Sequence, residues 1–295
     1  MNVLLLVGAD GWLGTSIKKQ ITESFLKALN INVLLFHSKT SNNCFYEETS
    51  QDNILRRNIF GDFSRKRAFR ELNEILKSLN TKKLYVICTL GIIHPKKYRE
   101  FFDINFYAIK KIYKMCSNYN LIKFTYISSN SPFGFNNSGK LFNEMSKYRP
   151  FGGYGESKMM AEKFLLNLNN KNVITILRAP WFHGENMPLR QKKFLISASM
   201  GRFPVVAFGN NIRSIINVKD LAIASLMVTL HKRKFQIYWI CENNKSISEI
   251  MKLIQYAAFK NGFAKKKLKS SLIVLPPGFS SFFFIVDNIC LLYTS

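Results

Sequence analysis

Three glycines that follow a short apolar run at the N-terminus constrain the fold of this chain more than any other feature. Val3–Val7 reads as a buried strand, and Gly8, Gly11 and Gly14 come directly after it. Glycines at these places permit a tight turn, let the backbone approach a pyrophosphate and allow close packing of helix and strand. The following helix would direct its N–H groups and positive dipole end at the phosphates. The pattern predicts a dinucleotide-binding turn formed by Gly8, Gly11, Trp12, Leu13 and Gly14.

Apolar runs and helix-length amphipathic segments alternate over the first 177 residues. This alternation is typical of a parallel sheet with helices on both faces. We therefore predict an α/β fold, a doubly wound parallel sheet (Rossmann fold), over residues 1–177. Strands are expected at Val3–Val7, Asn32–Phe36, Ile54–Phe60, Leu84–Cys88, Lys123–Ser128 and Val173–Leu177, and helices at Leu13–Leu29, Arg67–Leu79, Glu100–Asn118 and Tyr154–Leu168.

The pattern loosens from residue 178 onwards. Residues 179–211 carry several prolines and glycines, which favours a loop-rich, smaller C-terminal substrate lobe over residues 178–295. Within it we expect a helix at 218–231 and a strand at 236–241 to pack back on the first domain. Ser246 and Glu249 have the spacing of a capping box, which predicts a further helix start. Because the chain ends soon after an apolar segment, we expect a C-terminus that is shorter than a complete lobe.

The formal net charge of +25 is the one unusual feature of the composition. Positive potential suits an anionic ligand such as a dinucleotide or sugar nucleotide, and it would also suit nucleic acid. However, the basic residues are scattered and abundant Lys, Asn, Ile and Phe indicate a compositional bias of the genome. With only short clusters at 65–67 and 265–267 and no recognisable nucleic-acid module, we expect no specific nucleic-acid partner.

The five cysteines and four histidines are dispersed, and no pair of cysteines has a CxxC spacing. This argues against a disulfide framework and a metal site, and it favours a reducing, cytoplasmic location. The N-terminal apolar run is short and lacks a basic leader, unlike a signal peptide. The apolar stretches at 272–275 and 282–286 are interrupted by Pro276–Gly278 and Asp287, so no transmembrane segment is expected.

Tyr154 and Lys158 form a Tyr-x-x-x-Lys pair on a predicted helix. Residues four apart lie on one face of a helix, so the Lys158 ammonium would favour the Tyr154 phenolate and lower its pKa. Tyr154 could then exchange a proton with a substrate hydroxyl or carbonyl during hydride transfer. Ser129 ends a predicted strand at the sheet edge where ligands of such folds bind, and its hydroxyl could hold the reacting oxygen.

These motifs, in this order, resemble the extended short-chain dehydrogenase/reductase family, the NAD-dependent epimerase/dehydratase group. The resemblance runs from Met1 to about Leu253. The GxxGxxG spacing matches the family's turn, although Val7 replaces the leading threonine. The resemblance implies Ser129, Tyr154 and Lys158 as catalytic residues, with Lys158 also holding the nicotinamide ribose. It implies further cofactor contacts at Asp62, Thr89, Leu90, Gly91, Asn105 and Pro180, and substrate contacts at Asn130 and Arg213, the last to a phosphate.

Two departures from the family pattern refine this expectation. Ser129-Asn130-Ser131 stands where 4,6-dehydratases of the family usually carry Thr-Asp-Glu, so the acid for elimination is missing. After the second strand, His37 and Lys39 stand where NAD-preferring members usually hold an acid for the ribose 2′-hydroxyl. Either cation could meet a 2′-phosphate, so NADP and NAD both remain candidates for the cofactor.

We therefore predict an NAD(P)-dependent oxidoreductase or epimerase acting on a hydroxyl or keto carbon, with a nucleotide sugar as substrate. One alternative is a 3β-hydroxysteroid dehydrogenase-like enzyme that oxidises an apolar alcohol. The other is a non-catalytic NAD(P)-binding regulatory protein, because the fold alone does not determine function. The resemblance also implies a homodimer through the predicted helices Glu100–Asn118 and Tyr154–Leu168.

Overall fold

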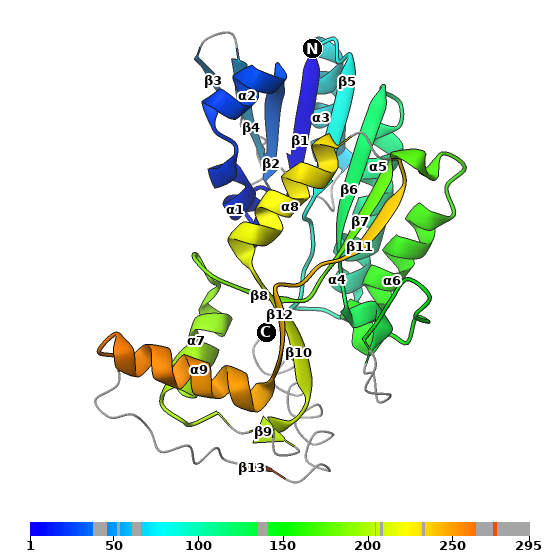
Figure 1. Cartoon of the computed structure of the whole chain (residues 1–295). Coiled ribbons are helices and arrows are strands. Elements are labelled where there is room, and N and C mark those ends of the chain that lie inside the picture. Colours follow the sequence, from blue (N-terminus) through cyan, green and yellow to red (C-terminus); the bar gives the residue numbers. More distant parts are fainter. Residues whose placement is uncertain are drawn as a thin grey trace. The chain divides into compact units, whose positions relative to one another are not determined.

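The computed structural model describes residues 1–37, 46–51, 54–60, 66–134, 141–203, 205–206, 209–231, 234–263 and 274–275 (Figure 1). The chain divides into two compact units. Met1–Ala179 and Val218–Ile240 form the first unit, and Pro180–Asn217 and Cys241–Ser295 form the second. No helix in the described ranges is both long and apolar enough to cross a membrane.

The first unit contains a sheet with the strand order β11-β7-β6-β5-β1-β2-β4-β3. Every neighbouring pair is parallel except β3 and β4, so the predicted doubly wound parallel sheet is confirmed. The antiparallel edge strand β3 was not predicted, because its sequence YEETSQ has no apolar run. The strands are β1 (Asn2–Val7), β2 (Asn32–His37), β3 (Tyr46–Gln51), β4 (Ile54–Phe60), β5 (Lys83–Cys88), β6 (Leu121–Ser129), β7 (Ile174–Ala179) and β11 (Gln236–Trp239).

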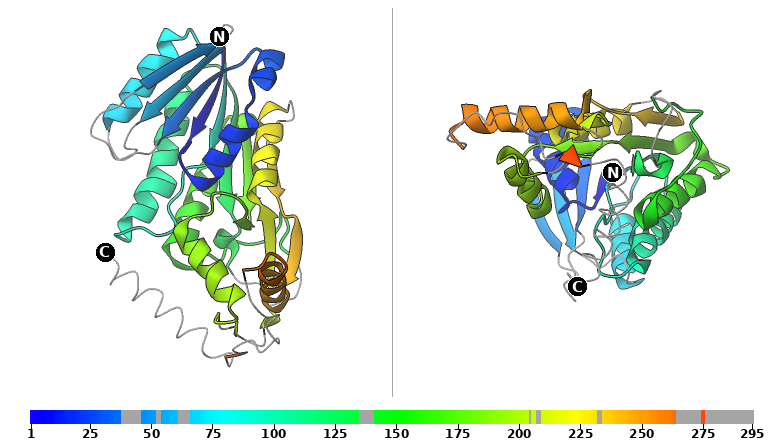
Figure 2. Two further views of the ribbon diagram at one scale, coloured as in Figure 1. Left: turned by 90° about the vertical axis from the view of Figure 1, so that its left-hand side faces the viewer. Right: turned by 90° about the horizontal axis from the view of Figure 1, so that it is seen from below.

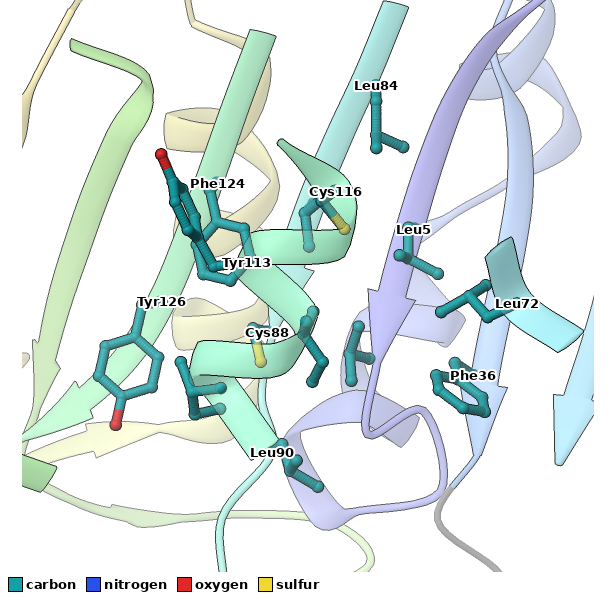
Figure 3. Close-up of a cluster of buried hydrophobic side chains, with 14 of the residues drawn as sticks. Leu5, Phe36, Leu72, Leu84, Cys88, Leu90, Tyr113, Cys116, Phe124 and Tyr126 are labelled. Atoms are coloured by element: carbon teal, nitrogen blue, oxygen red, sulfur yellow. The ribbon is translucent and has the colours of Figure 1, made fainter. Parts of the chain in front are cut away.

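Helices cover both faces of this sheet. On one face α1 and α8 lie side by side (Figures 1 and 2), and Thr229 of α8 donates a hydrogen bond to Thr125 of β6 at 2.8 Å. On the other face α3, α5 and α6 bury the main hydrophobic core, part of which is drawn in Figure 3. The helices are α1 (Trp12–Gln20), α2 (Glu23–Leu29), α3 (Lys66–Ser78), α4 (Arg99–Phe102), α5 (Ile109–Cys116), α6 (Gly152–Leu166) and α8 (Val218–Leu230), with single turns at Ser131–Phe133 and Lys171–Val173.

Two predicted helices differ in detail from the observed ones. The predicted helix 13–29 is interrupted, because Thr22 begins a new helix by accepting a hydrogen bond from the Phe25 N–H at 3.2 Å. The predicted helix 100–118 continues from α4 to α5 through a π-helical stretch, Asp103–Ala108. Such wide turns are rare and often occur at functional sites.

The second unit has a three-stranded sheet in the order β12-β10-β8, with α7 and α9 packed together beside it. Within the range 179–211, which was predicted to be loop-rich, the structure also has β8 (Trp181–His183), α7 (Leu189–Ser199) and β9 (Val205–Val206). Pro188 does not interrupt α7, because it stands at the N-cap, before the first helical residue. The other elements are β10 (Ile212–Asn217), β12 (Asn243–Ser246), α9 (Ile247–Lys260) and β13 (Val274–Leu275).

The predicted capping box at the start of α9 is confirmed. The Glu249 N–H donates to the Ser246 hydroxyl at 3.1 Å, and the Ser246 N–H donates to the Glu249 carboxylate at 2.7 Å. Each side chain therefore satisfies a backbone donor that the helix itself leaves without a partner.

Candidate active site

The glycine turn after β1 has no room for side chains. Gly8 has φ +83°, and a Cβ there would lie 2.8 Å from the Thr89 hydroxyl oxygen. A Cβ on Gly14 would lie 2.1 Å from the Gly8 carbonyl oxygen. The Thr89 hydroxyl in turn bonds to the carbonyl oxygens of Val7 (2.9 Å) and Gly8 (3.1 Å). The ends of β1 and β5 are thus held together at a bare backbone surface.

The start of α1 fits the phosphates of a dinucleotide. Gly11 is its N-cap in an extended conformation, and no side chain caps the helix there. The first turn, which begins with Trp12 and Leu13, contains no acidic residue. The positive end of the helix dipole thus meets no carboxylate within its first turn, which suits the binding of an anion.

A second loop, after β5, is fixed by the buried Asn105 in the π-helical stretch. The Asn105 side chain accepts a hydrogen bond from the Ile92 N–H at 2.7 Å and donates to the Ile92 carbonyl at 3.0 Å. It also donates to the Ser157 hydroxyl at 3.1 Å, which ties the loop to α6. Within this loop a Cβ on Gly91 would lie 3.1 Å from the Lys158 Nζ atom, so glycine leaves room for the lysine.

Lys158 is buried and directed at the strand ends. Its ammonium donates to the carbonyl oxygens of Ile127 (3.0 Å) and Leu90 (3.4 Å), and it lies 4.8 Å from the centroid of the Tyr126 ring. Burial lowers the pKa of Lys158 to about 8, against smaller opposite effects of Cys88 and Glu162. The ammonium is therefore charged at neutral pH but much closer to titration than an exposed lysine.

Tyr154 lies one helical turn before Lys158 on α6. Burial raises the pKa of Tyr154 to about 12, and a hydrogen bond with Ser129 acts in the opposite direction. The expectation that Lys158 lowers this pKa is wrong for the chain by itself, because desolvation outweighs other effects on the phenol. The Lys158 ammonium is also engaged with backbone carbonyl oxygens.

Ser129 ends β6 and is buried. Its hydroxyl accepts a hydrogen bond from the Ser131 N–H at 3.1 Å and donates to the Ser131 hydroxyl at 3.1 Å. The neighbouring Asn130 N–H donates to the Ala179 carbonyl of β7 at 3.2 Å. These bonds hold the Ser129 hydroxyl at the carboxyl end of the parallel strands.

Behind Ser129 lies a buried ion pair that sequence reasoning missed. Glu162 of α6 accepts hydrogen bonds from Arg178 (2.8 Å), Tyr148 (2.7 Å) and Ser128, and the side chains of the ion pair are 0% and 3% exposed. The Arg178 guanidinium carbon lies 4.4 Å from the Phe133 ring centroid and 4.9 Å from that of Trp239. The spacing of Glu162 in the sequence does not show which strand carries its partner.

The remaining predicted residues lie in other parts of the chain. His37 is buried, and its ring bonds the Asn58 side chain at 3.0 Å. Lys39 and Asp62 lie outside the described residues. Pro180 and Arg213 belong to the second unit, where Arg213 of β10 stands directly opposite Lys245 of β12. This second cation was also missed, because the pairing of two strands cannot be read from spacing.

The first unit thus contains most of the predicted cofactor-binding and catalytic residues. They are Gly8, Gly11, Gly14, Thr89, Leu90, Gly91, Asn105, Ser129, Tyr154 and Lys158. In the described part of the chain no three His, Cys, Asp or Glu side chains are grouped so that they could hold a metal ion.

Comparison with known proteins shows the family of this chain. The NAD dependent epimerase/dehydratase family matches residues 4–241. An uncharacterized protein of Sinorhizobium fredii, y4nL, is 30% identical over 263 residues, which cover 85% of this chain and 71% of that protein. An Escherichia coli O157:H7 protein is 24% identical over 222 residues, or 74% of this chain and 60% of that protein. Its name is N-acetyl-alpha-D-glucosaminyl-diphospho-ditrans,octacis-undecaprenol 4-epimerase.

Solved structures share the fold at lower identity. The dTDP-glucose 4,6-dehydratase of Bacillus anthracis in complex with NAD has a TM-score of 0.70 and 16% identity, over 94% of this chain and 85% of that one. The UDP-glucose 4-epimerase of Thermotoga maritima with UDP-glucose has a TM-score of 0.66 and 17% identity, over 94% and 86% of the chains.

Proposed function

Because the chain belongs to the NAD dependent epimerase/dehydratase family, we propose that it is an NAD(P)-dependent oxidoreductase or epimerase acting on a hydroxyl or keto carbon of a sugar diphosphate. The observation that carries this proposal is the buried Lys158 ammonium at the strand ends, where it bonds the carbonyl oxygens of Ile127 and Leu90 one helical turn after Tyr154, with Ser129 at the end of β6. Few structural roles explain a half-buried phenol with a buried hydroxyl and a buried ammonium at the strand ends.

Each residue of the centre has a role in this proposal. Ser129 binds the reacting oxygen, and Tyr154 gives that oxygen a proton or takes one from it. Lys158 contributes positive charge beside the reacting groups and holds the nicotinamide ribose. When bound at the glycine turn, NAD(P) supplies the hydride acceptor and donor for the substrate carbon. Since the Tyr154 pKa is about 12, Tyr154 is protonated at neutral pH and is poised as a proton donor to a carbonyl.

The second unit supports an anionic substrate. Arg213 and Lys245 are paired directly across two antiparallel strands, where like charges normally destabilise a sheet. A diphosphate between sugar and carrier would neutralise both cations. The T. maritima structure contains UDP-glucose, and the E. coli relative is named for a sugar carried by a lipid diphosphate. A sugar diphosphate is the chemistry that both names share, so we assign a nucleotide sugar as the first substrate to test.

The cofactor preference follows from the end of β2. His37 is buried against Asn58, so a basic contact to a 2′-phosphate would depend on Lys39. We propose NAD as the first cofactor to test and NADP as the second.

The decisive variant is Tyr154→Phe, assayed with NAD and NADP against UDP-, GDP- and dTDP-sugars and a polyprenyl-diphosphate sugar. We expect turnover with one substrate class, loss of at least ~100-fold in the variant, and unchanged dinucleotide binding in a thermal-shift titration. Tyr107→Phe, at an exposed tyrosine of the same unit, is the matched control.

Three results would overturn the proposal in different ways. Full turnover by Tyr154→Phe would remove Tyr154 from the chemistry. Oxidation of a sterol alcohol, with no response to sugar diphosphates, would establish the 3β-hydroxysteroid dehydrogenase-like alternative. Dinucleotide binding without turnover of any substrate would favour a regulatory protein.

A further inference from the structure

Lys158 is a buried cation that no carboxylate neutralises directly. It is 3% exposed, and none of the acidic side chains in the described ranges forms an ion pair with its ammonium. Glu162 lies one helical turn farther along α6, but its carboxylate accepts hydrogen bonds from Arg178 and Tyr148. Because an isolated buried charge is costly, other groups must stabilise the Lys158 ammonium.

Three groups contact this ammonium. The carbonyl oxygens of Ile127 and Leu90 accept two of its three N–H groups, at 3.0 and 3.4 Å. The third contact is with a ring, since the Lys158 Nζ atom lies over Tyr126 of β6, 4.8 Å from the ring centroid. The face of an aromatic ring is partially negative and attracts a cation, most strongly where water is excluded.

Four other lysines lie over aromatic rings in the described ranges, but their contacts are weaker. Their Nζ atoms are 5.6–5.7 Å from the ring centroids, and the lysines are exposed or half-buried. Water competes with the ring for such an ammonium, whereas Lys158 and Tyr126 are both buried. These four lysines are Lys110, Lys111, Lys163 and Lys171.

Tyr126 acts on Lys158 through its ring and not as an anion. It is fully buried in the hydrophobic cluster drawn in Figure 3, and its hydroxyl has no hydrogen-bond partner. Burial raises the pKa of Tyr126 well above its ordinary value, so the phenol stays neutral. What Tyr126 offers the ammonium is therefore the face of a neutral aromatic ring.

The other titratable groups around this pair are Cys88 of β5 and Tyr154 and Glu162 of α6. Burial raises the pKa of Cys88 to about 11 and that of Tyr154 to about 12, so both are neutral at neutral pH. Glu162 is the one acidic side chain among them, and it is already paired with Arg178. The ring of Tyr126 thus has no competitor for the ammonium among these neutral groups.

We propose that Tyr126 is a positioning residue, whose ring keeps the Lys158 ammonium charged and in place at the carboxyl ends of the strands. The backbone also restricts the ammonium, because a Cβ on Gly91 would lie 3.1 Å from the Nζ atom. The effect on turnover rests on the proposed function, in which Lys158 supplies positive charge. The effect on the titration of Lys158 does not.

The test compares two variants of the full chain that differ only in the electron density of one ring, Tyr126→Phe and Tyr126→trifluorophenylalanine. Fluorine withdraws electrons from the ring face at nearly unchanged size, so it weakens the attraction for a cation and preserves the packing. The pKa of Lys158 is read from an NMR titration of the lysine side chains. Its signal is identified by its absence in Lys158→Met.

We expect Tyr126→Phe to keep the Lys158 pKa at about 8, because the ring remains. The fluorinated variant should lower this pKa to about 7, with an unchanged melting temperature. Equal Lys158 pKa values in the two variants would overturn the proposal. Because this titration needs neither cofactor nor substrate, that outcome is distinct from a failure of the proposed function, which would appear as absence of turnover in the wild type.

Turnover provides the second measurement. At about pH 7.5 the fluorinated variant should be about threefold slower than Tyr126→Phe, because less of its Lys158 is charged. Near about pH 6 the two rates should be equal, since Lys158 is charged in both variants. The same loss at both pH values would show that the ring only packs, and it would overturn the positioning role.

Discussion

The glycine turn and the proposed Ser129–Tyr154–Lys158 centre both belong to the first unit, yet they are held by opposite means. The turn depends on missing atoms, since a Cβ on Gly14 would lie 2.1 Å from the Gly8 carbonyl oxygen. The centre depends on buried polar groups, because Asn105, Glu162 and Arg178 all lie behind it with hydrogen bonds to three different segments. The glycines of the turn can be recognised in the sequence, whereas the partners of the buried polar groups cannot.

The largest expected effect is the loss of stability when the buried Glu162–Arg178 ion pair is broken. Glu162→Gln should destabilise the protein by about 3–5 kcal/mol, because it leaves the buried Arg178 charge without its carboxylate. Chemical denaturation measures the change. Adding Arg178→Met to Glu162→Gln should restore much of the stability, since no uncompensated charge then remains. If Glu162→Gln alone costs under ~1 kcal/mol, the ion pair is not what supports the centre.

The next effect tests the turn. Gly14→Ala should cost roughly 3 kcal/mol, because the added methyl meets backbone that cannot move aside. It should also abolish dinucleotide binding in a thermal-shift titration. Gly11→Ala is the control for stability, since its Cβ would lie 3.3 Å from the Gly8 carbonyl oxygen and its φ of −66° suits any residue. Equal losses of stability in both variants would contradict a steric origin.

The free energy of unfolding should depend on pH through Lys158, whereas the glycine turn contributes no titrating side chain. The Lys158 pKa is about 8 in the folded protein against 10.5 for an ordinary lysine, so the unfolded state binds more protons between these values. The free energy of unfolding should therefore rise from pH 8 to pH 9.5, by about 2 kcal/mol. Above pH 10 the raised Tyr154 pKa acts in the opposite direction.

The measurement is the difference between the wild type and Lys158→Met at each pH. Methionine keeps the volume without the charge, so this variant should be the more stable one below pH 8. Its unfolding free energy should lack the rise. Parallel pH profiles for the two proteins would mean that Lys158 titrates normally.

The smallest effect concerns the Tyr126 hydroxyl, which is buried without a hydrogen-bond partner. Tyr126→Phe keeps the ring that faces the Lys158 ammonium at 4.8 Å. The change should alter stability by less than ~1 kcal/mol, and toward the stable side, because a desolvated hydroxyl is removed. A clear loss of stability would show that the hydroxyl has a partner in solution.

Much of the fold could be predicted because its strands and helix starts are encoded by patterns of neighbouring residues. The apolar runs located the six predicted strands of the parallel sheet, and the Ser246–Glu249 spacing located the start of α9. The polar edge strand β3 and the break at Thr22 carry no apolar signal, so periodicity did not reveal them. Pro188 was misleading, because the same residue type breaks a helix inside it and begins one at its end.

By itself, the sequence determined the glycine turn, the Tyr-x-x-x-Lys pair and the alternation of strand and helix, since each is encoded by neighbouring residues. Only the tertiary structure decided that Glu162 meets Arg178, that Asn105 secures the loop after β5, and that Arg213 stands opposite Lys245. These contacts join residues that are 13 to 32 positions apart in the sequence. Their formation depends on which strands become neighbours and in what register, and one-dimensional spacing does not contain that information.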